Sequence, residues 1–274
     1  MSAVELAPTH KVGLTLTNPC MPAAGCFGFG GEYGSLVNVE ALGAVVYGPV
    51  TGRPRPGSPP PRLVPLPYGV LVHTGLANPG ARALVRRARQ MWSNLPVPVI
   101  AHVAATTPDE VASCCQQLGT LETVAGLELG LTDETTPQEA GALVAAARES
   151  AAQPLIVRLG LASAEALCQV AVEAGADALT VAAPPRGTLR LPSGEYLTGR
   201  LYGPWVLPLA LHALRQVRRA VDVPLIGCGG IHTEEDAQAF LEAGAVAVQV
   251  DSVIWRDPGR LARIARALAA PATP

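Results

Sequence analysis

The chain has 274 residues, of which 49% are hydrophobic and 15% charged, and its formal net charge is -2. The near-neutral charge argues against a nucleic-acid partner, and no run approaches the roughly 18 uncharged apolar residues that a membrane span requires. The length suits a single domain over residues 1–274, since an α/β barrel takes about 250 residues. No basic flank precedes an apolar segment near the start, so we expect a cytoplasmic protein.

The six cysteines show neither Cys-x-x-Cys spacing nor companion histidines in zinc-finger register. We therefore expect no metal site, and reduced thiols that pack as small hydrophobic side chains. The basic residues are unevenly chosen, because Lys11 is the only lysine and the others are all arginine. Because Lys11 lies before the first expected strand, a site that needs a lysine within the barrel has none to use.

Short apolar runs alternate with helical segments along the chain, a pattern typical of βα units that build a parallel sheet. The expected strands cover residues 21–25, 43–50, 98–103, 126–130, 154–159, 178–182, 224–228 and 245–250. Between them, Thr107-Pro108 and Thr136-Pro137 each offer a hydroxyl cap followed by proline, which indicates a helix start. Eight such strands predict the α/β class and a single (β/α)8 TIM barrel with an N-terminal extension.

Two insertions interrupt this rhythm, one after the second strand and one after the sixth. Residues 54–67 contain seven prolines, too many for a helix or a central strand, and predict a rigid loop over the barrel top. Residues 184–202 contain several glycines and arginines on the face where barrel enzymes build their sites. A mobile lid and an ordinary surface loop are both compatible with this second segment.

The stretch from Pro224 to Ser252 holds two apolar strands, one ending in Gly229-Gly230 and the other in Ser252. Glycines let backbone amides approach an anion without an intervening Cβ, and a hydroxyl residue completes such a cradle. These residues predict a site for a phosphorylated cofactor.

Further segments have the order and spacing of one known family: residues 17–25 (TNPCMPAAG), 27–33 (FGFGGEY), 51–57 (TGRPRPG) and 75–80 (GLANPG), and Gly203-Pro204 with Pro208. Together with the glycine cradle they resemble the dihydroorotate dehydrogenases, most closely the cytosolic flavin-binding catalytic subunits. The resemblance implies an oxidoreductase of pyrimidine biosynthesis that holds FMN at the C-terminal mouth of its barrel and oxidises dihydroorotate to orotate.

The resemblance also implies site residues and partners. The residues expected to bind FMN are Ala24, Gly25, Thr51, Arg158, Gly203, Gly229, Gly230 and Ser252. Besides a small-molecule substrate, the resemblance suggests a homodimer, as in cytosolic relatives, and the iron-sulfur and FAD subunit of one class. No residue of this chain by itself supports either interface.

Oxidation of dihydroorotate needs a base over the substrate, a cation near flavin N1 and amide side chains that grip orotate. Where the family has Asn-x-Ser-Cys-Pro-Asn after its fourth strand, with cysteine or serine as base, this chain reads GLTDE at residues 130–134. The expected lysines fall at Arg158 and at or beside Tyr47. Three expected asparagines are replaced by Val72, His102 and Ala183. We therefore expect altered or lost dihydroorotate activity.

The replacements suggest chemistry of their own, because His102, Asp133 and Arg158 would all lie near the barrel mouth. In this catalytic hypothesis Asp133 is the base, Arg158 clamps an anion, and His102 carries a proton or contacts the flavin. The alternative is that residues 132–137 form an ordinary loop and helix N-terminus.

The cofactor prediction is weakened at one position, because Asp251 stands where the family has a glycine before its hydroxyl residue. A carboxylate close to a phosphate lowers affinity unless it turns away or binds a cation. Three hypotheses therefore remain: an FMN-dependent oxidoreductase with an altered substrate, a non-catalytic barrel kept for assembly or regulation, and a flavin-free lyase or isomerase that holds a phosphorylated substrate.

Overall fold

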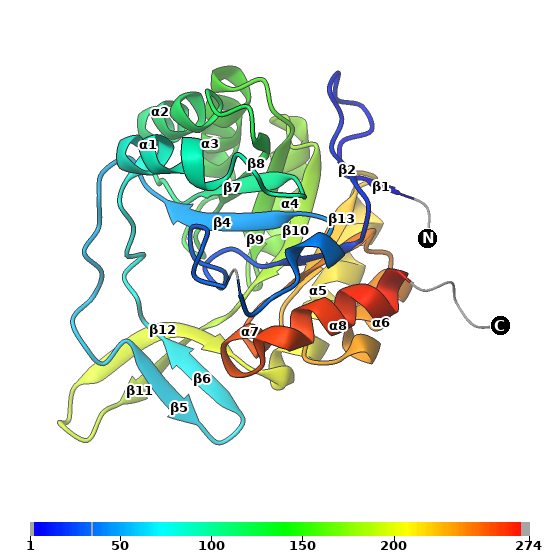
Figure 1. The fold of residues 1–274 in the computed structure, drawn as a ribbon. Coiled ribbons are helices and arrows are strands. Elements are labelled where there is room, and N and C mark those ends of the chain that lie inside the picture. The colour runs from blue at the N-terminus through cyan, green and yellow to red at the C-terminus, as the bar shows by residue number, and fades with distance from the viewer. Residues whose placement is uncertain (1–2, 34, 270–274) are drawn as a thin grey trace.

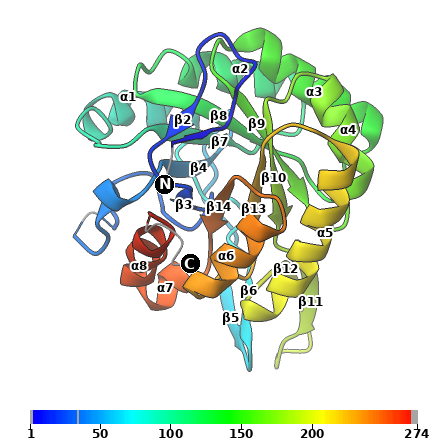
Figure 2. The same cartoon turned by 90° about the vertical axis from the view of Figure 1, so that its right-hand side faces the viewer.

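The computed structural model describes residues 3–33 and 35–269 of the chain. Eight parallel strands form its centre: β3 (Cys20–Pro22), β4 (Val45–Val50), β7 (Val99–Val103), β8 (Val124–Gly130), β9 (Leu155–Gly160), β10 (Ala178–Ala183), β13 (Leu225–Cys228) and β14 (Ala247–Val250). Their order is β3-β14-β13-β10-β9-β8-β7-β4, and helices surround them (Figure 1, Figure 2). Every one of these strands overlaps a predicted one, so the barrel prediction is confirmed.

The first and last strands of this order close the ring through single backbone hydrogen bonds. Gly43 donates to the carbonyl of Cys20 at 2.9 Å, and Gly25 donates to that of Gly48 at 3.0 Å. The sheet is therefore a nearly closed barrel, and the carboxyl ends of its strands meet at one mouth.

The helices are α1 (Ala81–Met91), α2 (Pro108–Leu118), α3 (Pro137–Ser150), α4 (Ala164–Glu173), α5 (Leu207–Ala220), α6 (Glu234–Glu242), α7 (Val253–Arg256) and α8 (Pro258–Ala269), with 3-10 turns η1 (Val39–Ala41) and η2 (Pro204–Val206). The predicted caps are present. The Thr107 side chain accepts from the Glu110 amide, and Thr136 forms a capping box with Glu139.

The barrel interior has two layers of different character, because alternate residues of a strand point to the same face. The lower layer is apolar: Met21, Ala44, Val46, Ile100, Ile156, Ala178, Ile226 and Ala247. Two residues further along their strands, the upper layer is polar: His102, Arg158, Thr180, Cys228 and Gln249, joined by Glu128. The interior therefore changes from a dry core to a polar site within one layer of side chains.

The N-terminal extension closes the bottom of the barrel. Strands β1 (Val4–Glu5) and β2 (Thr15–Leu16) pair as an antiparallel hairpin. Its buried residues, among them Leu6, Leu14 and Leu16, pack with the apolar lower layer. Figure 2 shows this hairpin in front of the ring of strands. The extension thus seals the end opposite the mouth.

The two insertions are present where predicted, but they carry regular structure that the sequence analysis did not foresee. Strands β5 (Leu63–Leu66), β6 (Gly69–Val72), β11 (Arg186–Arg190) and β12 (Tyr196–Tyr202) form one antiparallel sheet in the order β11-β12-β6-β5. Figure 1 shows this sheet projecting from the barrel. Pro65 lies in the edge strand β5, where a missing backbone donor breaks no ladder.

Leu16→Ala tests the sealing role of the hairpin. Leu16 is fully buried, and truncating such a leucine leaves a cavity, so we expect the free energy of unfolding to fall by about 3 kcal/mol. Urea denaturation followed by circular dichroism measures the change. The control Val12→Ala, at a side chain that is 70% exposed, should change stability by less than about 0.5 kcal/mol. Equal effects of the two substitutions would contradict the assignment.

Candidate active site

A pocket of about 550 Å³ opens at the carboxyl ends of the barrel strands, where barrel proteins carry their sites. Among the residues expected to form a site, Ala24, Gly25, His102 and Arg158 line it. Strands β6 and β12 contribute Val72, Arg200 and Tyr202, so the projecting sheet reaches the mouth.

Glu128 is the centre of the polar layer and was not identified from the sequence. It is fully buried, and its carboxylate accepts hydrogen bonds from His102 Nδ1 at 2.6 Å, Thr180 Oγ1 at 2.8 Å and Gln249 Nε2 at 2.6 Å. These partners come from three different strands of the barrel. A charged group without water is tolerated only with such compensation.

The titration of Glu128 reflects opposing effects. Burial alone would raise the pKa of its carboxyl, but the hydrogen bond and charge of His102, the charge of Arg158 and the hydrogen bond from Thr180 together lower that pKa to about 2. Glu128 is therefore an anion at neutral pH. Because it then only accepts, His102 Nδ1 must carry a proton, and Nε2 is the nitrogen left for the pocket.

Arg158 supplies the cation of the polar layer. Its guanidinium is 5% exposed and donates to Gln249 Oε1 at 3.2 Å and to Cys228 Sγ at 3.4 Å. Burial opposes its charge, but Cys228, Glu128 and Tyr202 outweigh burial and raise the pKa of Arg158. Burial raises the pKa of Cys228 to about 12 despite the arginine, so its thiol stays protonated and serves as a packing partner.

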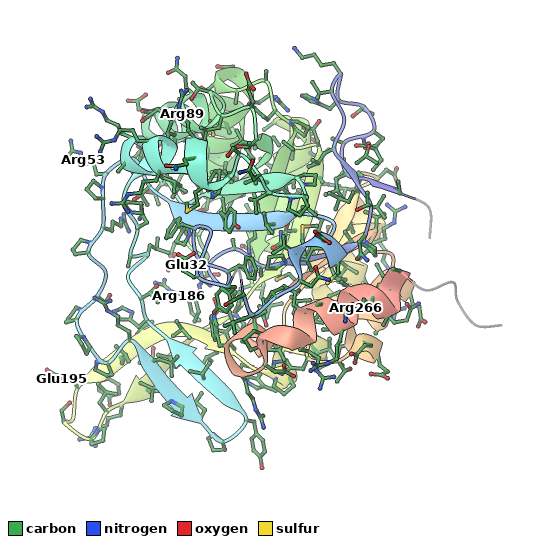
Figure 3. All side chains as sticks on the ribbon, viewed as in Figure 1. Glu32, Arg53, Arg89, Arg186, Glu195 and Arg266 are labelled. Atoms are coloured by element: carbon green, nitrogen blue, oxygen red, sulfur yellow. The ribbon has the colours of Figure 1, made fainter. Side chains whose placement is uncertain are left out.

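The structure does not bring Asp133 into the pocket with His102 and Arg158. Its carboxylate lies 2.6 Å from Arg200 Nη1 and 3.9 Å from Arg186 Nε. Figure 3 shows Arg186 between the barrel and the projecting sheet. In this position Asp133 joins strands β11 and β12 to the loop after β8. The carboxylate that contacts His102 is Glu128, and Gln249 connects it to Arg158.

Three of the positions expected to hold lysine or asparagine carry aromatic or aliphatic side chains: Tyr47, Val72 and Ala183. Tyr47 is buried and stacks on Trp92, with ring centroids 5.1 Å apart, so its side chain packs toward α1. Its neighbour Gly48 lines the pocket, but a Cβ there would lie 2.6 Å from the carbonyl oxygen of His102. Val72 and Ala183 also line the pocket and offer no side-chain hydrogen bond.

The remaining predicted cofactor residues lie outside the pocket lining. Thr51 is buried and bonds to Asn78 and to the carbonyl of Arg53. Gly203 packs against the turn between β5 and β6, where a Cβ on Gly203 would lie 2.4 Å from the Tyr68 carbonyl oxygen. The two loops that carry Gly229, Gly230 and Ser252 lie against each other, because Ser252 Oγ after β14 lies 3.4 Å from His232 Nε2 in the loop after β13.

FMN can be compared with these residues at its two ends. The ring end fits, because the pocket is roomy, a Cβ on Gly25 would meet no atom within 4 Å, and Arg158 provides a cation. The phosphate end does not fit, because the buried carboxylate of Asp251 already accepts the Ser252 amide and, at 3.0 Å, its hydroxyl.

A barrel of eight parallel strands with a charged pocket at their carboxyl ends defines a (β/α)8 barrel protein of the kind that binds small molecules at its mouth. The chain belongs to the dihydroorotate dehydrogenase family, whose model matches residues 6–271. The resemblance drawn from the sequence motifs is thereby confirmed. Catalytic subunits of this family are flavoproteins that bind FMN and act in pyrimidine biosynthesis.

Individual relatives agree with this family. The chain is 38% identical to the catalytic subunit of dihydroorotate dehydrogenase B (NAD(+)) from Pelobacter propionicus, over 94% of this chain and 91% of the relative. It is 38% identical to the subunit of the same name from Desulforudis audaxviator, over 92% of this chain and 88% of the relative. The corresponding subunit from Geobacter sulfurreducens is 37% identical, over 96% of this chain and 90% of the relative.

No helix within residues 3–33 and 35–269 has both the length and the apolar character needed to cross a lipid bilayer.

Glu128→Gln tests the polar layer. At pH 7 the variant leaves Arg158 without its buried counter-charge, so we expect the free energy of unfolding to fall by about 3 kcal/mol. A lowered carboxyl pKa adds stability above the ordinary value near 4.5, and this stability is lost as the pH falls toward 2. Urea denaturation between pH 7 and pH 2.5 should therefore show the difference between wild type and variant shrinking below pH 4.5.

Glu122→Gln provides the matched control, because Glu122 is exposed just before β8. This substitution should change stability by less than about 0.5 kcal/mol at either pH. A Glu128→Gln difference that is the same at pH 7 and pH 2.5 would contradict an ionised, hydrogen-bonded Glu128.

Proposed function

We propose that the chain is a flavin-dependent oxidoreductase of the dihydroorotate dehydrogenase family that acts on an anionic small molecule other than dihydroorotate. One observation carries the proposal: Arg158 and His102 line the same mouth pocket and are linked through buried Glu128. The pocket thus combines a permanent cation with an imidazole whose Nε2 can act as a proton acceptor.

In this proposal the flavin ring lies in the mouth pocket near Ala24, Gly25 and Arg158. When bound, the flavin supplies the acceptor for a hydride. Arg158 stabilises negative charge in the pocket, and its burial strengthens that effect because the surroundings are poorly polarisable. The space beside Gly25 and the presence of Arg158 in the pocket lining support this placement of the ring.

His102 is the proposed proton acceptor. Glu128 fixes its ring by accepting a hydrogen bond from Nδ1–H, so Nε2 is the basic nitrogen, and the Glu128 carboxylate stabilises the imidazolium that forms. Asp133, the base expected from the sequence, pairs with Arg200. Its proposed role is to position the projecting sheet over the pocket.

The pocket lining favours an anionic substrate. Four arginines line it, Arg55, Arg62, Arg158 and Arg200, and no carboxylate side chain of the described residues does. The asparagine amides that the family uses for orotate are replaced by Val72, His102 and Ala183, all of which line the pocket. The two expected lysines fall at Arg158 and at or beside Tyr47. A dihydroorotate ring would therefore leave its polar edge unpaired, and unpaired buried polar groups discriminate strongly between substrates.

The substrate assignment is tested with dihydroorotate itself. The purified chain, supplied with FMN or riboflavin and an artificial electron acceptor, should show no dihydroorotate oxidation above the rate without protein. A relative of the family under the same conditions provides the positive control. Turnover within about tenfold of that relative would contradict the proposal.

The role of Arg158 is tested by the reduction potential of bound flavin. Arg158→Met removes the cation that stabilises the reduced, anionic ring, so we expect the potential to fall by at least about 30 mV, equivalent to about 1.4 kcal/mol for a two-electron couple. Arg158→Lys retains the positive charge and should therefore shift the reduction potential less than Arg158→Met. An unchanged potential in the methionine variant would place Arg158 away from the ring.

The relatives are named as catalytic subunits, so assembly with a further subunit or a second copy of this chain belongs to the proposal. Both the homodimer and the iron-sulfur and FAD subunit stay predictions.

A further inference from the structure

The end of β14 differs from a free anion site, because its donors are already bonded. The Ser252 amide donates to Asp251 Oδ1, and the Ser252 hydroxyl donates to the same oxygen at 3.0 Å. In the predicted cradle these two groups would hold a phosphate together with the backbone amides of Gly229 and Gly230. A carboxylate of this chain therefore occupies the place expected for the phosphate of FMN.

Asp251 is held there as a buried anion without a counter-ion. It is 1% exposed, and no lysine, arginine or histidine among the described residues lies within 4.0 Å of its carboxylate. Burial raises the pKa of Tyr202 and of Cys228, and the charge of Asp251 raises both further. A phosphate dianion placed on the Ser252 donors would lie against this carboxylate and meet repulsion.

The mouth pocket also ends before the cradle. Tyr202 and Trp255 line the pocket and pack edge to face, with ring centroids 5.0 Å apart and an interplanar angle of 66°. Gly229 and Gly230, which follow β13, and Ser252, which follows β14, do not line the pocket. The cradle is tight as well, since a Cβ on Gly230 would lie 2.4 Å from the Leu207 amide nitrogen.

We propose that Asp251 replaces the phosphate of the cofactor, so that this barrel selects flavin by its ring and rejects the phosphorylated form. The inference rests on the proposed flavin function and adds the chemical class of the ligand: an isoalloxazine whose side chain ends without a phosphate, for which riboflavin is the probe. Riboflavin needs no donors from Ser252 and brings no charge toward Asp251.

The experiment measures binding of both flavins to the full chain. The protein is freed of ligand and titrated with riboflavin and with FMN, and quenching of flavin fluorescence reports binding. Wild type should bind riboflavin at least tenfold more tightly than FMN. Asp251→Gly frees the two Ser252 donors and removes the repelling charge, so its affinity for FMN should rise at least tenfold, while its affinity for riboflavin changes less than threefold.

Two further variants separate charge, space and folding. Asp251→Asn keeps a side chain of the same size without the charge, so FMN affinity should rise less than in the glycine variant. Asp257→Asn removes a carboxylate six residues away that pairs with Arg260 and Arg263, and it should leave the preference unchanged. If the glycine variant does not fold, the asparagine variant and the wild-type comparison still decide the question.

Each outcome bears on one of the two proposals. Tighter binding of FMN than of riboflavin by wild type would overturn the role of Asp251 and leave the flavin function standing. The same preference in wild type and Asp251→Gly would also overturn it. If wild type binds neither flavin and the glycine variant binds FMN, the role of Asp251 stands and the flavin function fails. If no variant binds either flavin, both proposals fail.

Discussion

A buried carboxylate at the barrel centre, Glu128, determines most of what surrounds it. An ionised group removed from water must recover its lost hydration from hydrogen bonds and opposite charge. Strands β7, β10 and β14 supply the direct donors, and Arg158 on β9 supplies the charge. The upper layer is therefore one connected unit, in which no member can change without leaving another unpaired.

This polar unit is separate from the core that closes the barrel. The apolar lower layer and the N-terminal hairpin form the core that keeps the barrel closed, and none of the buried residues of this core lines the pocket. The polar layer above them fixes the tautomer of His102 and holds Arg158 extended across the barrel. Family membership and a different reaction are therefore compatible, because fold and site depend on different layers of side chains.

Local patterns in the sequence were sufficient for the barrel, because caps such as Thr136 and short apolar runs reflect interactions within a few residues. The projecting sheet was missed because β6 and β12 come from insertions far apart in the chain, and their pairing is a tertiary event. Glu128 was missed for a similar reason. A single charge within residues 126–130 gives no sign of facing inward until the partners on other strands are placed.

The two buried carboxylates of the mouth, Glu128 and Asp251, differ in how their charge is compensated. Glu128 has a cation nearby and strong donors from side chains, whereas Asp251 takes its donors from Ser252 and has no cation within 4.0 Å among the described residues. A carboxylate that depends on backbone and hydroxyl donors leaves fewer of them for a ligand. The same substitution that breaks the glycine pattern of the family therefore engages the two Ser252 donors of the predicted cradle within the chain itself.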